Sequence, residues 1–346
     1  MTNIVYLDNN ATTKVDPQVL EAMLPYFSEA FGNPSSVHRY GQRAESAVDA
    51  ARETVSAALN CQPEEIIFTA CGSESDNLAL RGVALAMREK TGANWILTNR
   101  AEHPAVSRTA SQLQELYGFR VEWLDVDEQG MVLPQVVEKA ICDSTAIVSV
   151  MYANNETGVV FPIEEIGAIV KEKGALFHTD AVQALGKLAV NFGLLGVDMM
   201  TLSAHKLGGP IGAGALIVRD GLALEPLVHG GGQELRRRAG TENVMGIAAL
   251  GAACEIAGQD LEKNMAHMKC LRDRLHEGIM HQVDDVRLNG HKDFRLPNTL
   301  YLSFHGLEAN RILEEIGLEM GLTRERIRQL QNSALRRLRA RLEARD

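Results

Sequence analysis

The chain has 346 residues, a net charge of −10 at pH 7 and 45% hydrophobic residues. Because single cores stop growing near roughly 250–300 residues, this length predicts one large domain and a smaller companion. The composition excludes a largely disordered protein, and the acidic balance gives the protein as a whole no electrostatic reason to coat nucleic acid.

The N-terminus and the cysteines indicate the compartment. The first eight residues lack a basic stretch followed by an apolar core, and no segment reaches the roughly 18 consecutive apolar residues of a membrane helix. Five scattered cysteines without a CxxC pair argue against a disulfide framework or a zinc site. We therefore expect a cytoplasmic protein without a metal ion and without a membrane partner.

Short apolar runs alternate with longer helical patterns along most of the chain. Helical patterns begin at Ser75 and after Pro104. The apolar runs are typical of buried strands, and most are separated by segments of crossover length; they cover residues 65–69, 94–97, 146–151, 175–178, 199–203 and 214–218. This alternation predicts an α/β fold with a largely parallel central sheet.

The pattern changes in the last third of the chain. A long helical pattern begins near Gly251 and continues from Leu261 toward Leu275, and residues 296–304 are typical of a strand. We expect a smaller lobe to start here. From Asn310 onward nine arginines stand against six acidic residues, so this segment carries a net charge of +3 on an otherwise acidic protein.

Polar residues that directly follow apolar runs are candidates for the active site, since ligands bind at the carboxyl ends of parallel strands. Lys206 ends one run beside Ser203 and His205, and its amine could form a Schiff base with an aldehyde cofactor. Asp180 ends a neighbouring run, where it could keep a pyridine nitrogen protonated. These are the requirements of pyridoxal 5'-phosphate (PLP), whose protonated ring accepts electrons from the substrate.

A phosphate cradle is expected between a strand and a helix, where Cys71, Gly72 and Ser73 offer backbone N–H groups and a hydroxyl. Ser203 and His205 could close on the same phosphate. Each residue taken alone is more often structural, and it is the joint occurrence that favours a PLP site. For His103 two interpretations stand side by side: a residue that caps a helix or lies on the surface, or one that stacks on the pyridine ring.

Seven ordered motifs resemble the cysteine desulfurases of PLP fold type I. They are YLDNNATT (6–13), FGNPSS (31–36), ESDN (74–77), NNETG (154–158), HTDAVQ (178–183), SAHK (203–206) and GGGQE (230–234). The resemblance covers residues 4–307. FTACGSE (68–74) and EHPAV (102–106) are similar to the branch associated with nitrogen-fixation gene clusters.

The resemblance implies a role for each site residue. Lys206 binds the cofactor covalently and later acts as the general base, Asp180 faces the ring nitrogen, and His103 stacks on the ring. Gln183 and Asn155 lie at the ring hydroxyl. The remaining implied roles are phosphate binding by Gly72, Ser73, Ser203 and His205, phosphate binding by Thr241 from the second subunit of a homodimer, and cofactor and substrate-carboxylate binding by Asn33.

The resemblance also implies a reaction, the conversion of L-cysteine to L-alanine with sulfur passed to an enzyme cysteine as a persulfide. In the family this cysteine lies on a Ser/Gly/Ala-rich loop in the C-terminal lobe, and an arginine beyond it binds the substrate carboxylate. Neither is found in this sequence. We expect structural roles for Cys61, Cys71, Cys142, Cys254 and Cys270, because a sulfur-accepting thiol must be exposed and mobile.

The segment after residue 310 resembles the last helix-turn-helix of primary bacterial sigma factors. The motifs are LEEIG (313–317), GLTRERIRQ (321–329) and ALRRLR (334–339). In this resemblance Thr323 caps a recognition helix that faces a major groove. The other interpretation is half a DNA-binding module left by a gene rearrangement.

We therefore expect a class-V, fold type I protein in three parts: a large PLP-binding domain over 16–255, a truncated small domain from 1–15 and 256–309, and a helical tail over 310–346. The predicted function is a PLP-dependent cysteine desulfurase that supplies an iron–sulfur scaffold or another sulfur acceptor, with impaired activity if the nucleophile loop is lacking. The alternative is a DNA-binding regulator that uses the desulfurase scaffold as a platform for the tail.

Overall fold

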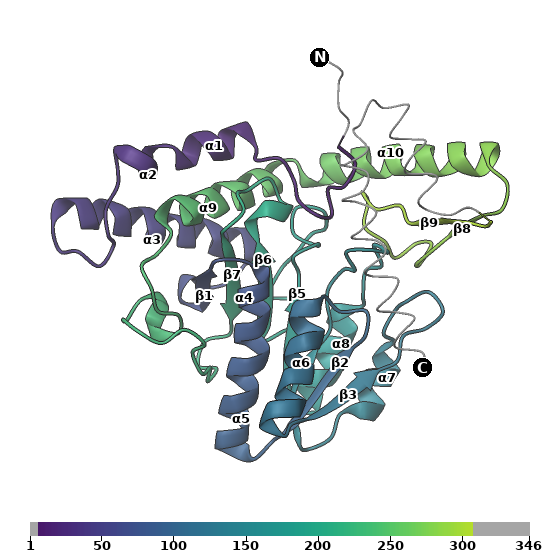
Figure 1. The fold of residues 1–346 in the computed structure, drawn as a ribbon, viewed down its shortest axis with the longest axis horizontal. Helices are drawn as coiled ribbons and strands as arrows, with labels where there is room; N and C mark the ends of the chain where they lie inside the picture. Colours follow the sequence, from purple (N-terminus) through teal and green to yellow (C-terminus); the bar gives the residue numbers. More distant parts are fainter. Residues whose placement is uncertain (1–5, 307–346) are drawn as a thin grey trace.

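The computed structural model describes residues 6–306 (Figure 1). Its helices are α1 (Pro17–Met23), α2 (Pro25–Ser28), α3 (Arg39–Leu59), α4 (Gly72–Asn77), α5 (Val83–Thr91), α6 (Pro104–Tyr117), α7 (Pro134–Ala140), α8 (Ile163–Glu172), α9 (Val244–Gln259) and α10 (Leu261–Gln282). Short helical turns are η1 (Pro63–Glu65), η2 (Leu78–Gly82), η3 (Ala204–Lys206) and η4 (Glu234–Arg236).

A seven-stranded sheet forms the centre, in the order β1-β7-β6-β5-β4-β2-β3. The strands are β1 (Ile66–Thr69), β2 (Trp95–Asn99), β3 (Arg120–Leu124), β4 (Thr145–Ser149), β5 (Leu176–Asp180), β6 (Met199–Ser203) and β7 (Gly214–Val218). Strand β7 is antiparallel to both of its neighbours, whereas the other pairs are parallel. The mostly parallel sheet of the predicted α/β fold is thus confirmed.

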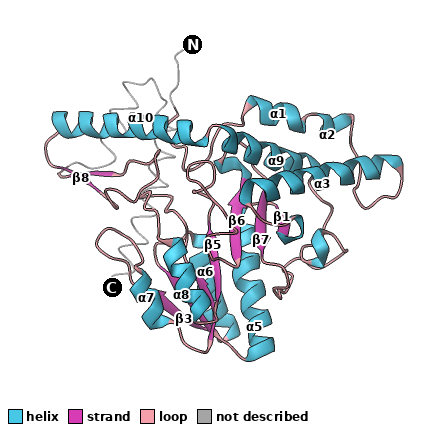
Figure 2. Ribbon diagram, turned by 180° about the vertical axis from the view of Figure 1, so that it is seen from behind, coloured by secondary structure: helices cyan, strands magenta, loops and turns pink. Residues whose placement is uncertain are grey.

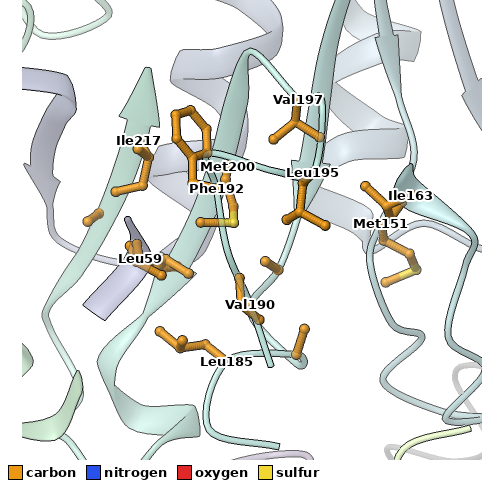
Figure 3. Packing of buried hydrophobic residues seen from close by; sticks show 14 of the residues in the cluster. Leu59, Met151, Ile163, Leu185, Val190, Phe192, Leu195, Val197, Met200 and Ile217 are labelled. Carbon is orange, nitrogen blue, oxygen red and sulfur yellow. The ribbon is translucent and has the colours of Figure 1, made fainter. Parts of the chain in front are cut away.

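Helices cover both faces of the sheet (Figure 1, Figure 2). Helices α4, α5 and α6 pack on one face, and α3, α7, α8 and α9 cover the other. Each face of the sheet packs against its helices in a separate hydrophobic core. Because side chains alternate along a strand, the strands contribute side chains to both cores. Figure 3 shows part of the larger core, with Phe192, Met200 and Ile217 among its members.

The alternation places a row of polar side chains on the face that α4 covers. In β5, Phe177 enters the core on the α3 and α9 face, so His178 and Asp180 point to the α4 face. In β6, Met200 and Leu202 enter that same core, so Thr201 and Ser203 also point toward α4. The site is therefore built from alternate residues of two adjacent parallel strands.

Helix α10 extends away from the sheet, with strands β8 (Val286–Leu288) and β9 (Leu302–Phe304) beside it (Figure 1, Figure 2). Strands β8 and β9 form an antiparallel pair. Within residues 6–306, no single helix has the length and apolar composition of a membrane span; α9 and α10 meet those criteria only as a pair, bent by 74°. The predicted domain boundary at residue 255 lies inside α9, whereas the chain bends only after the end of this helix. The division into domains stays a prediction.

Several predicted strands differ from the structure. The pattern over 296–304 yields only β9, since Pro297 cannot donate to a strand ladder and Leu296 is buried in a turn that precedes Asn298. Strand β3 was missed because its exposed Arg120 and Glu122 interrupt the apolar run at the edge of the sheet. The predicted tail over 310–346 lies outside the described residues.

Candidate active site

The carboxyl ends of β1, β5 and β6 meet at one edge of the sheet because these three strands run in the same direction. Strand β5 ends at Asp180, and β6 ends at Ser203, from which the turn η3 carries the chain to Lys206. Strand β1 leads through Cys71 into α4, which begins at Gly72. The fold thus places three predicted sites at one edge of the sheet: Asp180 for the ring nitrogen, Lys206 for attachment of the cofactor, and the start of α4 for the phosphate.

Lys206 is half-buried and is held by the N-terminal loop. Its Nζ donates hydrogen bonds to the main-chain oxygens of Asn10 at 2.5 Å and Ala11 at 2.9 Å. Burial lowers the pKa of Lys206 and outweighs the carboxylates of Asp180 and Asp8, whose charges act in the opposite direction. The amine is therefore neutral, and nucleophilic, at a lower pH than that of an exposed lysine.

Asp180 is a buried carboxylate whose charge requires a cation. Burial raises its pKa to about 6, although the N–H of Val182, which donates to Oδ1 at 2.9 Å, and the charge of Lys206 act against this rise. A cation placed against this carboxylate would be stabilised strongly in so dry a site. A protonated pyridine nitrogen meets that requirement.

Behind Asp180, a second carboxyl group lies in a buried polar network. His178 bonds to Ser149 Oγ through Nδ1 at 2.9 Å and to Thr201 Oγ1 through Nε2 at 3.0 Å. Asp76 Oδ1 lies 3.7 Å from His178 Nε2, and burial lowers the pKa of His178 to about 3, so the two form no ion pair near neutral pH. Burial, with Asp180 next, raises the pKa of Asp76 well above 3.8. This shift favours the neutral form of Asp76, which in turn favours ionisation of Asp180.

A third buried carboxylate, Glu102, fixes the loop that carries His103. Its Oε1 accepts from the main-chain N–H of Met151 at 2.7 Å and from Asn99 Nδ2 at 2.8 Å. Asn154 Nδ2 donates to the main-chain oxygen of Ala101 at 2.9 Å. The loop with His103 is thereby tied to the loop that contains Asn155.

His103 is the N-cap of α6. Its Nδ1 accepts from the N–H of Ala105 at 3.1 Å. The capping interpretation is therefore confirmed, and stacking on a cofactor ring stays a prediction. Because Nδ1 accepts, a proton on the neutral ring is on Nε2.

The predicted phosphate cradle has the shape of a binding site. A Cβ on Gly72 would lie 2.9 Å from Val182 Cγ2 and 3.5 Å from Ser203 Cβ, so only glycine leaves this space open. Ser203 is 2% exposed, and its Oγ has no hydrogen-bond partner among the described residues. A buried hydroxyl without a partner is costly, and a phosphate oxygen would satisfy it. Ser73 is exposed at the start of α4, and His205 Nδ1 lies 3.1 Å from Thr12 Oγ1.

Asn10 connects the predicted residues, although it was not itself predicted as a site residue. Its main-chain oxygen accepts from Gln183 Nε2 at 2.9 Å as well as from Lys206. Its side-chain Nδ2 donates to the main-chain oxygen of Asn155 at 3.1 Å and to Thr299 Oγ1 at 2.9 Å. The motif at 6–13 marked this segment, but no spacing in the sequence indicates contacts across 145 to 289 positions.

The loop that carries Thr241 is held by ion pairs to helices α3 and α4. Glu234 in η4 pairs with Arg52 of α3 at 2.9 Å, and Arg238 Nε donates to Glu74 of α4 at 2.7 Å. Three successive residues of η4, beginning with Glu234, have positive φ values of 43°, 57° and 64°. Such backbone is strained for residues other than glycine and persists only where surrounding contacts enforce it. Thr241 itself is exposed.

Two predicted site residues lie apart from this cluster. Asn33 is exposed, and its Oδ1 accepts from the N–H of Ser35 at 3.0 Å. Within residues 6–306 no hydrogen bond joins Asn33 or Thr241 to Lys206 or Asp180. Their roles stay predictions.

The cysteines divide into two groups. Burial raises the pKa of both Cys61 and Cys254 to about 12, which suits the predicted structural roles. Cys71, Cys142 and Cys270 are exposed, so burial does not support a structural role for these three, and their predicted structural roles stay predictions.

Comparison with known proteins identifies the family, since the class-V aminotransferase family matches residues 5–322. The chain belongs to this family. A cysteine desulfurase of Trichormus azollae is 48% identical over 311 residues, which is 90% of this chain and 77% of the relative. The cysteine desulfurase IscS of Clostridium botulinum (strain Hall) is 46% identical over 320 residues, 92% of this chain and 80% of the relative.

Solved structures of class-V relatives agree. A NifS-like protein superimposes with a TM-score of 0.87 at 40% identity, covering 92% of this chain and 86% of that one. A structure described as SspA in complex with cysteine gives a TM-score of 0.80 at 35% identity, covering 92% and 88%. The predicted resemblance and PLP fold type I are confirmed.

The family match corrects one predicted boundary. It continues to residue 322, so the end of the resemblance at residue 307 was placed too early. The comparisons give no support to the sigma-factor-like tail or to the DNA-binding alternative.

Proposed function

We propose that this chain is a PLP-dependent cysteine desulfurase that releases L-alanine from L-cysteine and passes the sulfur on for iron–sulfur cluster assembly. The observation that carries the proposal is the half-buried Lys206 amine beside the buried Asp180 carboxylate, in a chain 46–48% identical to proteins named cysteine desulfurase. When bound, PLP withdraws electrons from the α-carbon of the substrate, which allows bonds to that carbon and its neighbour to break.

Each side chain has a definite task in holding the cofactor. Asp180 would hold the proton on the ring nitrogen, and Gln183 with Asn155 would contact the ring hydroxyl. His103, fixed as the cap of α6, would cover one face of the ring. The residues that would hold the phosphate are Gly72, Ser73, Ser203 and His205.

Lys206 would serve both as the attachment point and as the proton carrier. Burial keeps a fraction of its amine neutral, so Nζ can accept a proton from the substrate and return it. The hydrogen bonds to Asn10 and Ala11 restrict Nζ to the edge of the sheet where Asp180 ends β5. In that position Nζ would be close to a cofactor whose ring nitrogen faces Asp180.

We further propose a homodimer in which Thr241 contacts the cofactor phosphate of the other subunit. Its support is the position of Thr241, which is exposed on a loop that Arg238 and Glu234 fasten to α4 and α3. A sulfur acceptor protein and a cytoplasmic location belong to the same proposal; five free cysteines suit a reducing compartment.

The test uses the whole chain supplied with PLP. We expect visible absorbance from bound cofactor and, after borohydride reduction, a single pyridoxyl label on Lys206. Addition of L-cysteine should produce alanine and sulfide in equal amounts when a thiol reductant is present. A folded protein that takes no label on Lys206 would refute PLP binding; a labelled protein that gives no alanine would refute only the desulfurase activity.

A further inference from the structure

Lys187 is a buried cation without a carboxylate partner. It is 5% exposed and lies four residues after Gln183, in the turns that follow β5. No acidic side chain within residues 6–306 forms an ion pair with its Nζ. Burying an unpaired charge destabilises a fold, so a lysine at this position calls for a compensating role.

Within residues 6–306, both hydrogen bonds of the Lys187 side chain go to Gln183. Its Nζ donates to Gln183 Oε1 at 2.9 Å and to the main-chain oxygen of Gln183 at 3.2 Å. The amide oxygen of Gln183 therefore faces Lys187, an arrangement that the charged form of the lysine requires because an ammonium group can only donate. The NH2 group of that amide therefore points the opposite way.

The NH2 group of Gln183 points into the predicted cofactor site. Its Nε2 donates to the main-chain oxygen of Asn10 at 2.9 Å, the same oxygen that accepts from Lys206 Nζ. A chain of hydrogen bonds thus runs from Lys187 through Gln183 and Asn10 to Lys206. Burial, with the charge of Lys206 next, lowers the pKa of Lys187 to about 7.

We propose that Lys187 is a positioning residue that fixes the amide of Gln183 with its NH2 group toward the ring hydroxyl of PLP. This inference rests on the proposed function. Without a donor at Oε1, only the bond from Nε2 to Asn10 would hold this orientation. A rotated amide would present its oxygen, which cannot donate a hydrogen bond to an ionised ring oxygen. Lys187 touches neither cofactor nor substrate in this role and acts only through Gln183.

The experiment is a double-mutant cycle on the cofactor-free full-length protein. The variants are Lys187→Met, which keeps the side-chain length but removes the donor, Gln183→Ala, and the two combined. Lys173→Met, at an exposed lysine after α8, is the matched control. The measurements are the dissociation constant for PLP, the absorbance maximum of bound PLP and the melting temperature without cofactor.

We expect Lys187→Met to weaken PLP binding roughly tenfold, as loss of one well-placed hydrogen bond does. The melting temperature without cofactor should be unchanged or higher, since an unpaired buried charge is removed. The absorbance maximum should move in the same direction in Lys187→Met and in Gln183→Ala. In the Gln183→Ala background, Lys187→Met should change binding less than about twofold, because the group it positions is gone.

The inference is overturned if Lys187→Met binds PLP as the parent protein does, or if its loss of binding is equally large in the Gln183→Ala background. A fall in binding that only accompanies a fall in melting temperature would equally refute it. Should Lys187→Met fail to fold, Lys187→Gln replaces it; this variant keeps a donor without the charge and should bind PLP better than Gln183→Ala. A parent protein that binds no PLP would refute the proposed function instead.

Discussion

The central sheet and the region of α10 differ in how they are stabilised. Every residue of β6, and every residue of β5 except Leu176, is buried, whereas no residue of α10 is. Apolar side chains of α10 such as Leu271, Leu275 and Met280 remain exposed. The sheet is held by apolar packing on two faces, and α10 contributes little to either core.

The two regions nevertheless meet at the active site through polar contacts. Asn298 and Thr299, between β8 and β9, bond to the side chain of Asn10, whose main chain holds Lys206. Apolar packing in the sheet supplies the stability, whereas the geometry of the site depends both on the ends of β5 and β6 and on polar contacts from the segment between β8 and β9. Four predictions test this difference between the two regions.

The largest effect is expected from Lys206→Ala. Loss of the attachment point and proton carrier should lower alanine production at least about 10³-fold, without unfolding the protein, since the side chain is only half-buried. Alanine release and the unfolding midpoint measure the two effects. Lys173→Ala is the control, and appreciable turnover by Lys206→Ala would contradict the assignment.

The packing contrast itself is tested by Phe177→Ala in β5 against Leu275→Ala in α10. Phe177 is fully buried, and its loss should lower the free energy of unfolding by about 3–5 kcal/mol. Leu275 is 53% exposed, and its loss should cost less than about 0.5 kcal/mol. Urea titrations of both variants measure these values. Equal losses would show that α10 is packed in solution.

A pH-dependent gain is expected from Asp76→Asn in the cofactor-free protein. Burial raises the pKa of Asp76 in the folded protein above its ordinary value of 3.8, so ionisation of this carboxyl destabilises the fold as the pH rises above about 4. An amide cannot ionise. The variant should therefore be more stable than the parent by about 1–3 kcal/mol at pH 8, with little difference near pH 4.

Urea titrations at both pH values measure this gain, and Asp76→Ala serves as a control for lost packing. A gain of equal size at pH 4 would show that ionisation is not its cause.

The smallest effect is expected from Thr299→Val, which keeps the shape of the side chain but removes the hydroxyl that accepts from Asn10. PLP binding should weaken by about three- to tenfold, because Asn10 loses one of the contacts that position it. Ser303→Ala, which removes the β9 hydroxyl that accepts from Asn289 just after β8, should leave binding unchanged. If Thr299→Val binds PLP as tightly as the parent protein does, the contact between Thr299 and Asn10 makes no contribution to cofactor binding.

Much of the fold was predictable because its strands are short apolar runs bounded by polar residues. Residues 199–203 and 214–218 became β6 and β7 with the predicted limits. The polar residues that follow such runs lie at the same edge of the sheet, so Asp180 and Lys206 could be paired from sequence. Asn10 and Lys187 could not, since neither follows a predicted strand.

Most strands of the central sheet, the class of cofactor and the family could be predicted from the sequence, because they depend on local hydrophobic patterns and on motifs that are contiguous in the chain. The pKa shifts of the buried side chains and the orientations of their polar groups became clear only from the folded structure. The buried network of Asp76 and His178 and the orientation of the Gln183 amide depend on contacts between distant segments and on exclusion of water. Neither is a property of any single stretch of sequence.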